Sequence, residues 1–400
     1  MGLIENENNS KQNITNFDSN LEFVQVSLTK SIRGKNITID LLQAFNEIMI
    51  SESIYQKILT GYILIKDRGK KFDHFLINGS ETLNIQFNSL LSGYKYTYKF
   101  KPTSFQKPFS ENNTELDQII RIDFEDFRYE SLVKEYSTSF KDTTISDFIK
   151  NFSTNILEIP LTNDTVEQTD TKLTKSIPYL KFHYILKYLQ QYAKSKSGNV
   201  GYLFYSDTLA TYYRTLEFLL SQSSSGEFFE THHQEQTTNL NNFCVWELLQ
   251  TSVNVKIAQL SRTMGSTNIY FDFGNKQYIS TSTSLSQLNT KLGNNNIYES
   301  KKDLPSSFHY QASDENVYPD MFVLNGSLDF GIKIQIQMNG LIERRCGTIG
   351  TFNFLNHVDP DFEYNEYLSG EYLITDIEHH IFPGEYQQII TIGKNGVNVA

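Results

Sequence analysis

Apolar and polar residues alternate along much of the first third of the chain. The segment LEFVQVSL at 21–28 shows the pattern, and YKYTYKFKP at 94–102 repeats it with tyrosines at alternate positions. A period of two puts successive side chains on opposite faces of a strand, which is typical of a half-buried sheet. Turn signals such as Asn78-Gly79 separate the alternating segments. We therefore predict a first antiparallel β-barrel domain over 22–135.

The periodicity changes near residue 140, where apolar residues recur at helical spacing. Two amphipathic helices are expected, one behind a capping pair formed by Thr144 and Asp147 and one after Pro178. Their apolar faces consist of Ile145, Phe148, Ile149, Phe152 and Ile156, and of Phe182, Ile185, Leu186, Leu189 and Tyr192. A buried strand, VGYLFY, follows, and TLATYYRTLEFLLSQ fits either a third helix or a strand plus a turn. These elements predict an α/β middle domain over 136–235.

Alternation returns in the last third of the chain. It is cleanest in GIKIQIQM, where we expect Ile332, Ile334, Ile336 and Met338 to face inward. Strands are also expected in VNVKIAQL, in a hairpin across Gly274-Asn275, and in RCGTIGTFNF, GEYLITDIEHHI and YQQIITIG.

The complete prediction is an α+β fold, mostly β, with two antiparallel β-barrels and an α/β middle region. The second barrel is discontinuous and combines 236–280 with 325–396. The remaining segments are a mobile N-terminus at 1–20, a polar loop at 222–242 and a polar insertion at 281–324.

The composition fits a folded chain, because 39% of the residues are apolar and 20% are charged. The net charge of −11 argues against a DNA-binding groove that neutralises phosphates, whereas an acidic wall suits a conduit through which DNA slides. The first residues lack the apolar stretch of a secretory signal, and no run approaches the ~20 apolar residues of a membrane span. We therefore expect no membrane anchor and synthesis in a cytoplasm.

Two cysteines, Cys244 and Cys346, are too few for a disulfide framework, and no CxxC pair suggests a zinc site. Both are interpreted as small buried apolar residues. Arg344 and Arg345 precede Cys346 and would lower the pKa of an accessible thiol. The simpler interpretation places Cys346 inward on a strand, with the arginines reaching solvent or a partner.

Two histidine pairs occur, His232-His233 in the polar loop and His379-His380 at the end of a predicted strand. Neighbouring side chains on a strand point to opposite faces, so neither pair can chelate a metal by itself. We expect the first pair to be solvated and one ring of the second pair to pack on the barrel. No HExxH, P-loop, GxSxG or dinucleotide fingerprint is present, so no metal, cofactor or catalytic residue is predicted.

Two alternative functions stay open. Asp123, Glu125, Asp126 and Glu130 lie close together in sequence, and a cell-wall hydrolase needs two carboxylates across a sugar cleft. The tyrosine-rich strand at 94–100 would suit a carbohydrate-binding adhesin.

The order of these segments resembles the baseplate hub protein of contractile-tailed phages of the T-even type, and is similar to the N-terminal half of VgrG in type VI secretion. The segments that carry the resemblance are SESIYQKILTGYILIKD, LINGSETLNIQF, DTTISDFIKNF, PYLKFHYILKYLQQYAKSKSGNVGYLFYSD, RCGTIGTFNF, SGEYLITDIEHHIF and YQQIITIG. They span about residues 22–395, and the chain departs from the family pattern over 222–320.

The resemblance implies two tail-tube-like barrels per chain and a homotrimer that forms a pseudo-sixfold ring. One face of this ring would meet the sixfold tail tube and the other would hold the threefold central spike, beside other baseplate proteins. DNA would pass through without specific binding during genome ejection. The protein would thus be a structural part of the virion tail, with RCGTIGTFNF as a barrel strand and Cys346 not a nucleophile.

Overall fold

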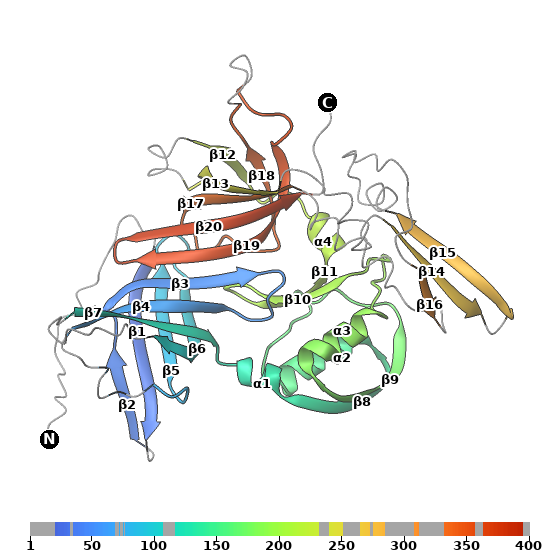
Figure 1. Ribbon diagram of the computed structural model, residues 1–400, viewed down its shortest axis with the longest axis horizontal. Coiled ribbons are helices and arrows are strands. Elements are labelled where there is room, and N and C mark those ends of the chain that lie inside the picture. The colour runs from blue at the N-terminus through green and yellow to red at the C-terminus, as the bar shows by residue number, and fades with distance from the viewer. Residues whose placement is uncertain are drawn as a thin grey trace.

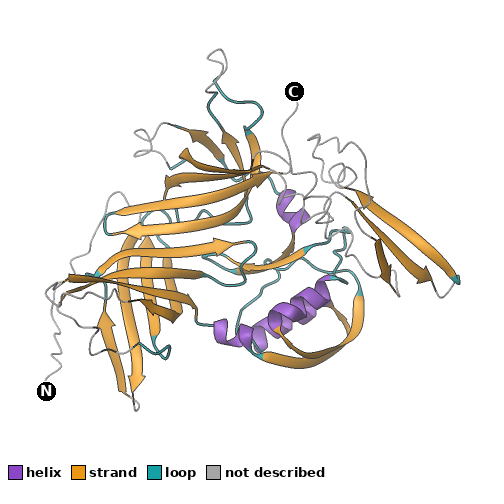
Figure 2. Ribbon diagram, viewed as in Figure 1, coloured by secondary structure: helices purple, strands orange, loops and turns teal. Residues whose placement is uncertain are grey.

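The computed structural model describes most of the chain and shows a mostly β fold with few helices (Figures 1 and 2). The described residues are 21–32, 35–68, 72, 75, 77–106, 117–231, 240–250, 265–272, 275–284, 308–311, 332–356 and 363–394. The predicted mobile segment 1–20, the pair His232-His233, the strand VNVKIAQL and most of 285–324 lie outside these residues. No helix in the described ranges is both long and apolar enough to cross a membrane.

Seven antiparallel strands form what we call the first module. They are β1 (Leu21–Ile32), β2 (Lys35–Asp40), β3 (Phe45–Ser53), β4 (Thr60–Arg68), β5 (Thr82–Ser89), β6 (Lys95–Gln106) and β7 (Asp117–Asp126). Their order in the sheet is β3-β4-β7-β6-β5-β1-β2. In β5 buried residues alternate strictly with half-buried ones, as the sequence period predicts. One apolar cluster fills the module and includes Ile48, Ile63, Ile85, Phe100 and Phe124.

The turn that leads into β5 shows how the sequence fixes this module locally. Gly79 has a φ of 87°, a conformation that glycine adopts without strain. The Glu81 carboxylate accepts hydrogen bonds from the backbone N–H groups of Asn78 and Gly79. Its Oε1 atom also lies 2.8 Å from Lys30 Nζ on β1, so one buried carboxylate holds both the turn and a neighbouring strand.

Six strands form the second module, a closed barrel. They are β12 (Glu227–Glu230), β13 (Asn242–Gln250), β17 (Ile332–Asn339), β18 (Ile349–Asn353), β19 (Gly370–Phe382) and β20 (Glu385–Lys394). The order is β18-β12-β13-β17-β20-β19, and β18 pairs again with β19 to close the ring. Strand β12 runs parallel to both of its neighbours. Ile332, Ile334, Ile336 and Met338 of β17 are all buried, which confirms the inward face predicted for this strand.

Parts of the predicted second barrel lie elsewhere. Strand β12 falls inside the stretch 222–242 that the sequence suggested was a loop, and its Phe228 is buried against Phe352 with ring centroids 4.7 Å apart. Strands β14 (Gly265–Asp272) and β15 (Gln277–Ser284) pair with each other and, through β14, with β16 (Phe308–Gln311) in a separate sheet. The hairpin was therefore placed wrongly within 236–280 of the barrel. Its parallel partner β16 comes from the predicted polar insertion, a distant pairing that local periodicity does not reveal.

The middle region combines four helices with short strands. Its elements are α1 (Tyr129–Val133), β8 (Glu135–Thr144), α2 (Ile145–Asn155), β9 (Lys172–Lys181), α3 (Phe182–Gln190), β10 (Tyr202–Ser206), β11 (Thr211–Thr215) and α4 (Leu216–Leu220). The Thr144 hydroxyl accepts a hydrogen bond from the backbone N–H of Asp147, as the capping pattern predicted. Three details differ from the sequence analysis: Ile156 is exposed, Pro178 lies within β9, and the segment after 208 forms a strand followed by a helix.

The two modules belong to one continuous sheet. Strand β19 pairs antiparallel with β3, from Asp376 opposite Ser53 to Ile381 opposite Ile48. Figure 1 shows β19 and β3 lying against each other where the two modules meet. The cores also exchange residues, because Ile381 and Tyr386 pack in the first module and Ile54 packs in the second.

Candidate functional site: the junction of the two modules

A buried carboxylate holds the junction together. Glu52, near the end of β3, has no exposed surface. Its Oε1 atom accepts a hydrogen bond from the backbone N–H of Cys346 at 2.9 Å, and its Oε2 atom accepts one from the backbone N–H of Thr208 at 2.7 Å. Glu52 therefore links the first module to the turn before β18 and to the turn between β10 and β11. Three separate parts of the chain meet at this side chain.

A polar network continues from Glu52 into the second module. His379 on β19 is fully buried, its Nδ1 lies 2.7 Å from the Tyr386 hydroxyl, and its Nε2 lies 3.8 Å from Glu52 Oε2. The Gln388 side-chain nitrogen lies 3.1 Å from His379 Nδ1, and its side-chain oxygen accepts a hydrogen bond from Arg344. Hydrogen bonds of this kind satisfy buried polar groups that would otherwise destabilise the fold.

Arg344 is buried in this network, contrary to the prediction that the arginines reach solvent or a partner. Its guanidinium donates hydrogen bonds to the backbone carbonyls of Leu240, at 2.7 Å, and Asn339, at 3.1 Å. Burial lowers the pKa of Arg344 to about 10. Arg345 is only half-buried, and its guanidinium donates to the Tyr212 hydroxyl at 3.3 Å. No local pattern in the sequence predicted that Arg344 would be buried and would donate hydrogen bonds to backbone carbonyls of the second module.

Cys346 lies in the turn before β18, so its placement on a strand was wrong, but its side chain packs inward in the core of the second module and both cysteines are buried, as predicted. Burial, followed by the charge of Glu52, raises the pKa of the Cys346 thiol well above its ordinary value. The side chain is 2% exposed, so the thiol is neutral and enclosed at physiological pH. The next residue, Gly347, has a φ of 79°, and a Cβ there would come within 2.5 Å of the Tyr205 hydroxyl. The glycine in this segment is thus required by a turn packed against the middle region.

Asp207 is the second buried carboxylate at the junction. Its Oδ1 atom accepts hydrogen bonds from the backbone N–H groups of Leu209 and Ala210, both at 2.8 Å. Burial and the nearby charge of Glu52 raise the pKa of Asp207 to about 6, although those hydrogen bonds oppose the shift. This carboxyl therefore changes its charge just below neutral pH.

The outer face of the junction carries a further set of contacts. His380 Nδ1 lies 2.9 Å from Glu47 Oε1 on β3, and its Nε2 lies 3.3 Å from Glu378 Oε2. The Tyr62 hydroxyl donates to the same Glu47 atom at 2.7 Å. Burial lowers the pKa of His380, but the bonds to Glu378 and Glu47 outweigh it and the net shift is upward. His379 and His380 thus face opposite sides of the strand, and the buried His379 confirms that one ring packs on the barrel.

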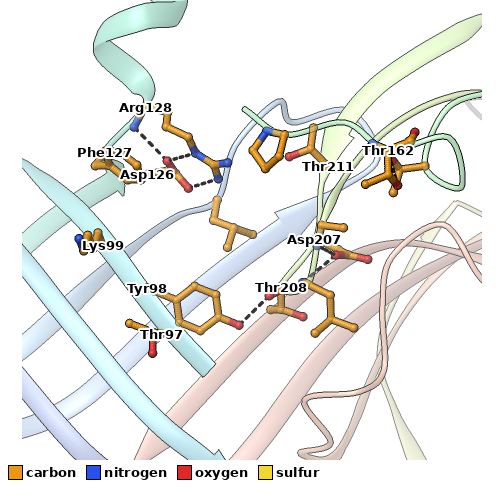
Figure 3. A pocket seen from close by; sticks show the side chains of 15 residues that line it. Thr97, Tyr98, Lys99, Asp126, Phe127, Arg128, Thr162, Asp207, Thr208 and Thr211 are labelled. Atoms are coloured by element: carbon orange, nitrogen blue, oxygen red, sulfur yellow. Dashed lines mark hydrogen bonds and ion pairs between the residues drawn. The ribbon is translucent and has the colours of Figure 1, made fainter. Parts of the chain in front are cut away.

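A pocket of about 560 Å³ lies beside the junction (Figure 3). It is bordered by β6, the segment after β7, the loop at 160–165 and the turn at 207–211, and it opens to solvent. The Tyr98 hydroxyl donates to the backbone carbonyl of Thr208 at 2.8 Å across one wall. On another wall Asp126 accepts two bonds from the Arg128 guanidinium, at 2.7 and 2.5 Å, and a third from the Arg128 backbone N–H. These contacts hold the first module to the middle region and leave the Asp126 charge compensated.

The carboxylates proposed for hydrolysis do not converge. Of the four, only Asp126 lines this pocket. Asp123 accepts from Arg121 at 2.7 Å and from Ser104 at 2.8 Å, and Glu130 lies 3.9 Å from Lys101. Glu125 differs, because burial raises its pKa and its Oε2 atom has no hydrogen-bond partner in the described part of the chain. It is a single shielded carboxyl without a facing partner, so the arrangement lacks the carboxylate pair that glycoside hydrolysis uses.

The tyrosine-rich strand is largely committed to packing. Tyr96 and Phe100 are buried in the first module, and Tyr98 packs against the same core. Tyr96, Tyr98 and Phe100 stack in a row with centroids 6.4 and 5.8 Å apart. Tyr94 alone of the four rings is strongly exposed, so the strand does not present an aromatic platform for sugars.

Comparison with known proteins identifies the fold. No protein-family model and no curated protein matches this sequence. Among solved structures, the tail protein from Neisseria meningitidis MC58 aligns with a TM-score of 0.53 and 9% identity, covering 94% of this chain and 98% of that chain. The 43 kDa tail protein of prophage MuSo2 from Shewanella oneidensis aligns with a TM-score of 0.51 and 12% identity, covering 93% and 98%. The chain therefore shares the fold of these two tail proteins over nearly its whole length, and the predicted fold class is confirmed.

Proposed function

We propose that this chain is a structural tail protein, the hub of a baseplate. Three copies form a ring that joins the sixfold tail tube to the threefold central spike and leaves a channel for DNA. The observation that carries the proposal is the β3–β19 pairing, which sets two β modules side by side in one chain that has the fold of two tail proteins.

The symmetry argument is geometric. A connector between threefold and sixfold partners must present three equivalent surfaces on one side and six similar ones on the other. When three copies of a chain with two fixed β modules close a ring, the ring has three equivalent chains and six similar modules. The buried contacts of Glu52 and the continuous sheet are the features expected of such a rigid pair.

The charge of the chain suits a conduit. With a net charge of −11 the protein has no electrostatic attraction for DNA phosphates, so DNA passes without being held. The place of action is the baseplate of the virion tail, after assembly in the host cytoplasm beside other baseplate proteins. The role is architectural, and the enclosed Cys346 and the paired Asp123 and Asp126 are in keeping with it.

Electron microscopy of the full chain, co-expressed with the products of the genes that flank its own, tests the proposal. We expect a threefold ring of six β modules stacked between a sixfold tube and a threefold spike. Purified chain alone is not the right sample, because contacts between copies need not be strong without the spike. A particle in which the chain occupies another symmetry, or lies outside the tail axis, would refute the hub function.

One observation favours a second candidate, a cell-wall hydrolase: the raised pKa of Glu125, a property of general acids. A turbidity assay with peptidoglycan and purified protein separates the two functions. Clearing that disappears in Glu125→Gln would support the hydrolase. The hub function predicts that neither the parent nor the variant clears the suspension.

A further inference from the structure

The pocket in Figure 3 is one half of a longer groove beside β6. A second pocket of about 500 Å³ continues it toward Tyr94, and the two pockets share four lining residues: Thr97, Tyr98, Thr208 and Leu209. Every residue that lines the groove belongs to the described part of the chain, and none is the neighbour in sequence of an undescribed segment. The groove therefore follows β6 from Tyr94 to Lys99.

Along this groove β6 has only one paired edge. Its pairing with β5 runs through Lys95, whereas its pairing with β7 stops at Phe100, opposite Asp126. The backbone N–H of Phe127 donates one more hydrogen bond, to the carbonyl of Lys99 at 3.1 Å. Past that point no strand among the described residues lies along this edge. The edge from Lys95 to Lys99 thus borders the groove without a neighbouring strand.

The hydrogen-bonding groups of this edge point into the groove. In an antiparallel strand the backbone N–H and C=O groups of alternate residues point to the same side. The carbonyl of Lys99 points toward β7, so the groups of Thr97 and Lys95 point the same way, and the bond from Ser89 N–H to the Tyr94 carbonyl shows that the residues between them point to β5. In the described chain no backbone group bonds to Thr97 or Lys95 on the groove side. An edge of this kind accepts an extended segment as an added strand.

The outer face of the edge is positively charged. Lys95 and Lys99 are exposed, and neither side chain forms an ion pair within the described ranges. Their cross-strand neighbours on β5 are Asn88 and Asn84, which carry no charge. A carboxylate that lies directly opposite either lysine on an added strand would therefore gain a favourable pair.

The inner face of the groove is partly apolar. The Tyr98 ring packs on the core of the first module, and its bond to the Thr208 carbonyl closes the groove on the inner side, as Figure 3 shows. Leu209 in the opposite wall is 49% exposed, and Tyr94 at the end of the groove is 68% exposed. Apolar side chains of an added strand would find contacts here.

The other charged groups of the groove are already bonded within the chain. Asp126 is paired with Arg128, Glu343 accepts hydrogen bonds from two serine hydroxyls, and Asp207 accepts two from backbone N–H groups. Arg345 donates to a tyrosine hydroxyl. The two lysines are thus the charges that an incoming segment can pair.

We propose that the edge of β6 from Lys95 to Lys99 binds an extended acidic segment of a partner protein as an added strand. The segment carries carboxylates at the two positions opposite these lysines. The residue midway between them lies opposite Thr97, and the two remaining residues are apolar and face Tyr98 and Leu209. The inference goes beyond the proposed hub function and does not require a ring.

The charges argue against a second copy of the same edge as the occupant. Antiparallel pairing of two such edges would set Lys95 of one copy opposite Lys99 of the other, and like charges in directly opposite positions are destabilising. Lysines on an open edge are a common means of preventing such self-pairing. The same lysines favour a segment of opposite charge, which is why the partner is acidic.

Fluorescence anisotropy with a synthetic peptide tests the binding. The full chain is titrated into a labelled peptide of alternating glutamate and valine, and into the same peptide with lysine in place of glutamate. We expect saturable binding of the glutamate peptide alone, with an affinity that falls as the salt concentration rises. No binding of the glutamate peptide, or equal binding of both peptides, would overturn the inference.

A charge reversal locates the binding. Lys95→Glu combined with Lys99→Glu should lower the affinity for the glutamate peptide about tenfold or more and should create affinity for the lysine peptide, with the melting temperature of the parent. Lys134→Glu combined with Lys141→Glu makes the same change of charge at exposed positions outside the groove and should bind like the parent. A groove variant that keeps the parent's preference would contradict the proposal.

Hydrogen exchange tests whether the edge is open and whether the backbone takes part. The amides of Lys95 and Thr97 should exchange rapidly in the full chain and become protected when the glutamate peptide is added. Protection without the peptide would mean that the chain or a second copy already covers this edge, and this result would refute the proposal.

A proline at the centre of the edge supplies the last measurement. Thr97→Pro removes the N–H that points into the groove, which the β5 pairing does not use, and should weaken binding of the glutamate peptide about tenfold. Thr97→Val keeps this N–H and should bind like the parent. Equal binding by both variants would show that no strand is added here. Neither variant affects the test of the hub function, which depends on the symmetry of the assembled particle.

Discussion

The β19 and β13 flanks of the barrel differ in how their strand edges and side chains are covered. On the β19 flank, a strand edge is paired with β3, and the groups around it are bonded by Glu52, His379 and His380. On the β13 flank, four apolar side chains are exposed: Val245, Trp246, Leu248 and Leu249. Strand β19 is thus paired on both edges over the junction, whereas among the described residues β13 is paired along its whole length only with β17.

The two flanks also differ in the polarity and burial of their side chains. The β19 flank is polar and buried, so its bonds fix one relative orientation of the two modules, since a shift would leave charged groups unpaired. The β13 flank is apolar, and two bulges interrupt its pairing with β17. A rigid pair of modules inside the chain is what the proposed ring requires.

The largest expected effect comes from breaking the strand that lies between both flanks. Ile334 of β17 is 1% exposed and pairs with β13 on one side and β20 on the other. Ile334→Asp places an unpaired charge in the barrel core and should lower the free energy of unfolding by about 5 kcal/mol. Chemical denaturation measures the change. Gln335→Asp, on the outer face, is the control and should cost far less; equal losses would mean that the strand register is wrong.

Breaking the β19 flank alone is the next test. Glu52→Ala leaves the buried backbone N–H groups of Cys346 and Thr208 without acceptors, and each such group costs about 1–3 kcal/mol. We expect a loss of about 4 kcal/mol in the free energy of unfolding, and about half of that for Glu52→Gln, which keeps one acceptor. If both variants unfold like the parent, Glu52 does not hold the junction.

The pH dependence of Asp207 sharpens the comparison, because the one carboxyl on the exposed run of β13, Glu247, is not buried. Its folded-state pKa of about 6 is above its ordinary value of ~3.9, so the unfolded chain ionises first as the pH rises. Stability therefore falls between about pH 4 and 6 and then levels off, by roughly 3 kcal/mol.

Asp207→Asn removes this titration and keeps an acceptor for Leu209 and Ala210. Between pH 4 and about pH 6, the free energy of unfolding of the variant should rise relative to that of the parent. From about pH 6 to pH 8 the difference should stay constant. A constant difference across the whole range would show that Asp207 keeps its ordinary pKa.

The smallest effect concerns the outer face of the junction. The pKa of His380 is raised, so its bonds to Glu47 and Glu378 stabilise the fold below about pH 6.5 and lose that contribution as the pH rises through the folded-state pKa. His380→Gln should cost about 1 kcal/mol at pH 5.5 and less at pH 8.5. His183→Gln is the control, because burial and then Lys57 and Lys181 lower the pKa of His183. The stability of this variant relative to the parent should be higher at pH 5.5 than at pH 8.5, the opposite of His380→Gln.

The sequence predicted the elements whose patterns are local. The alternation in β17 and most of the predicted apolar faces of α2 and α3 appear in the structure; Ile156 is exposed, and Tyr192 lies beyond the end of α3 and is half-buried. These features depend on period alone, and the burial of one face follows from it. The overall class, mostly β with two β modules, follows from such segments in order.

The sequence missed the elements that depend on distant partners. Strand β12 has only Phe228 and Phe229 as an apolar signal in a polar stretch, and its parallel partner β18 lies about 120 residues later. Arg344 looked like a surface residue because its acceptors, the carbonyls of Leu240 and Asn339 and the side chain of Gln388, come from three different segments. Glu52 carries no local signal at all, and only the fold brings its donors to it.

The hairpin of β19 and β20 has a consequence for how the chain folds. Its first strand completes the barrel through β18 and joins β3, whose paired residues are more than 300 positions earlier in the sequence. Contacts between such distant residues form late and slowly. Most of the first module's core comes from its own strands, which are synthesised first, whereas the barrel and the junction both wait for residues 370–394. A chain interrupted before that point has neither, so only chains synthesised through residue 394 carry the rigid pair of modules.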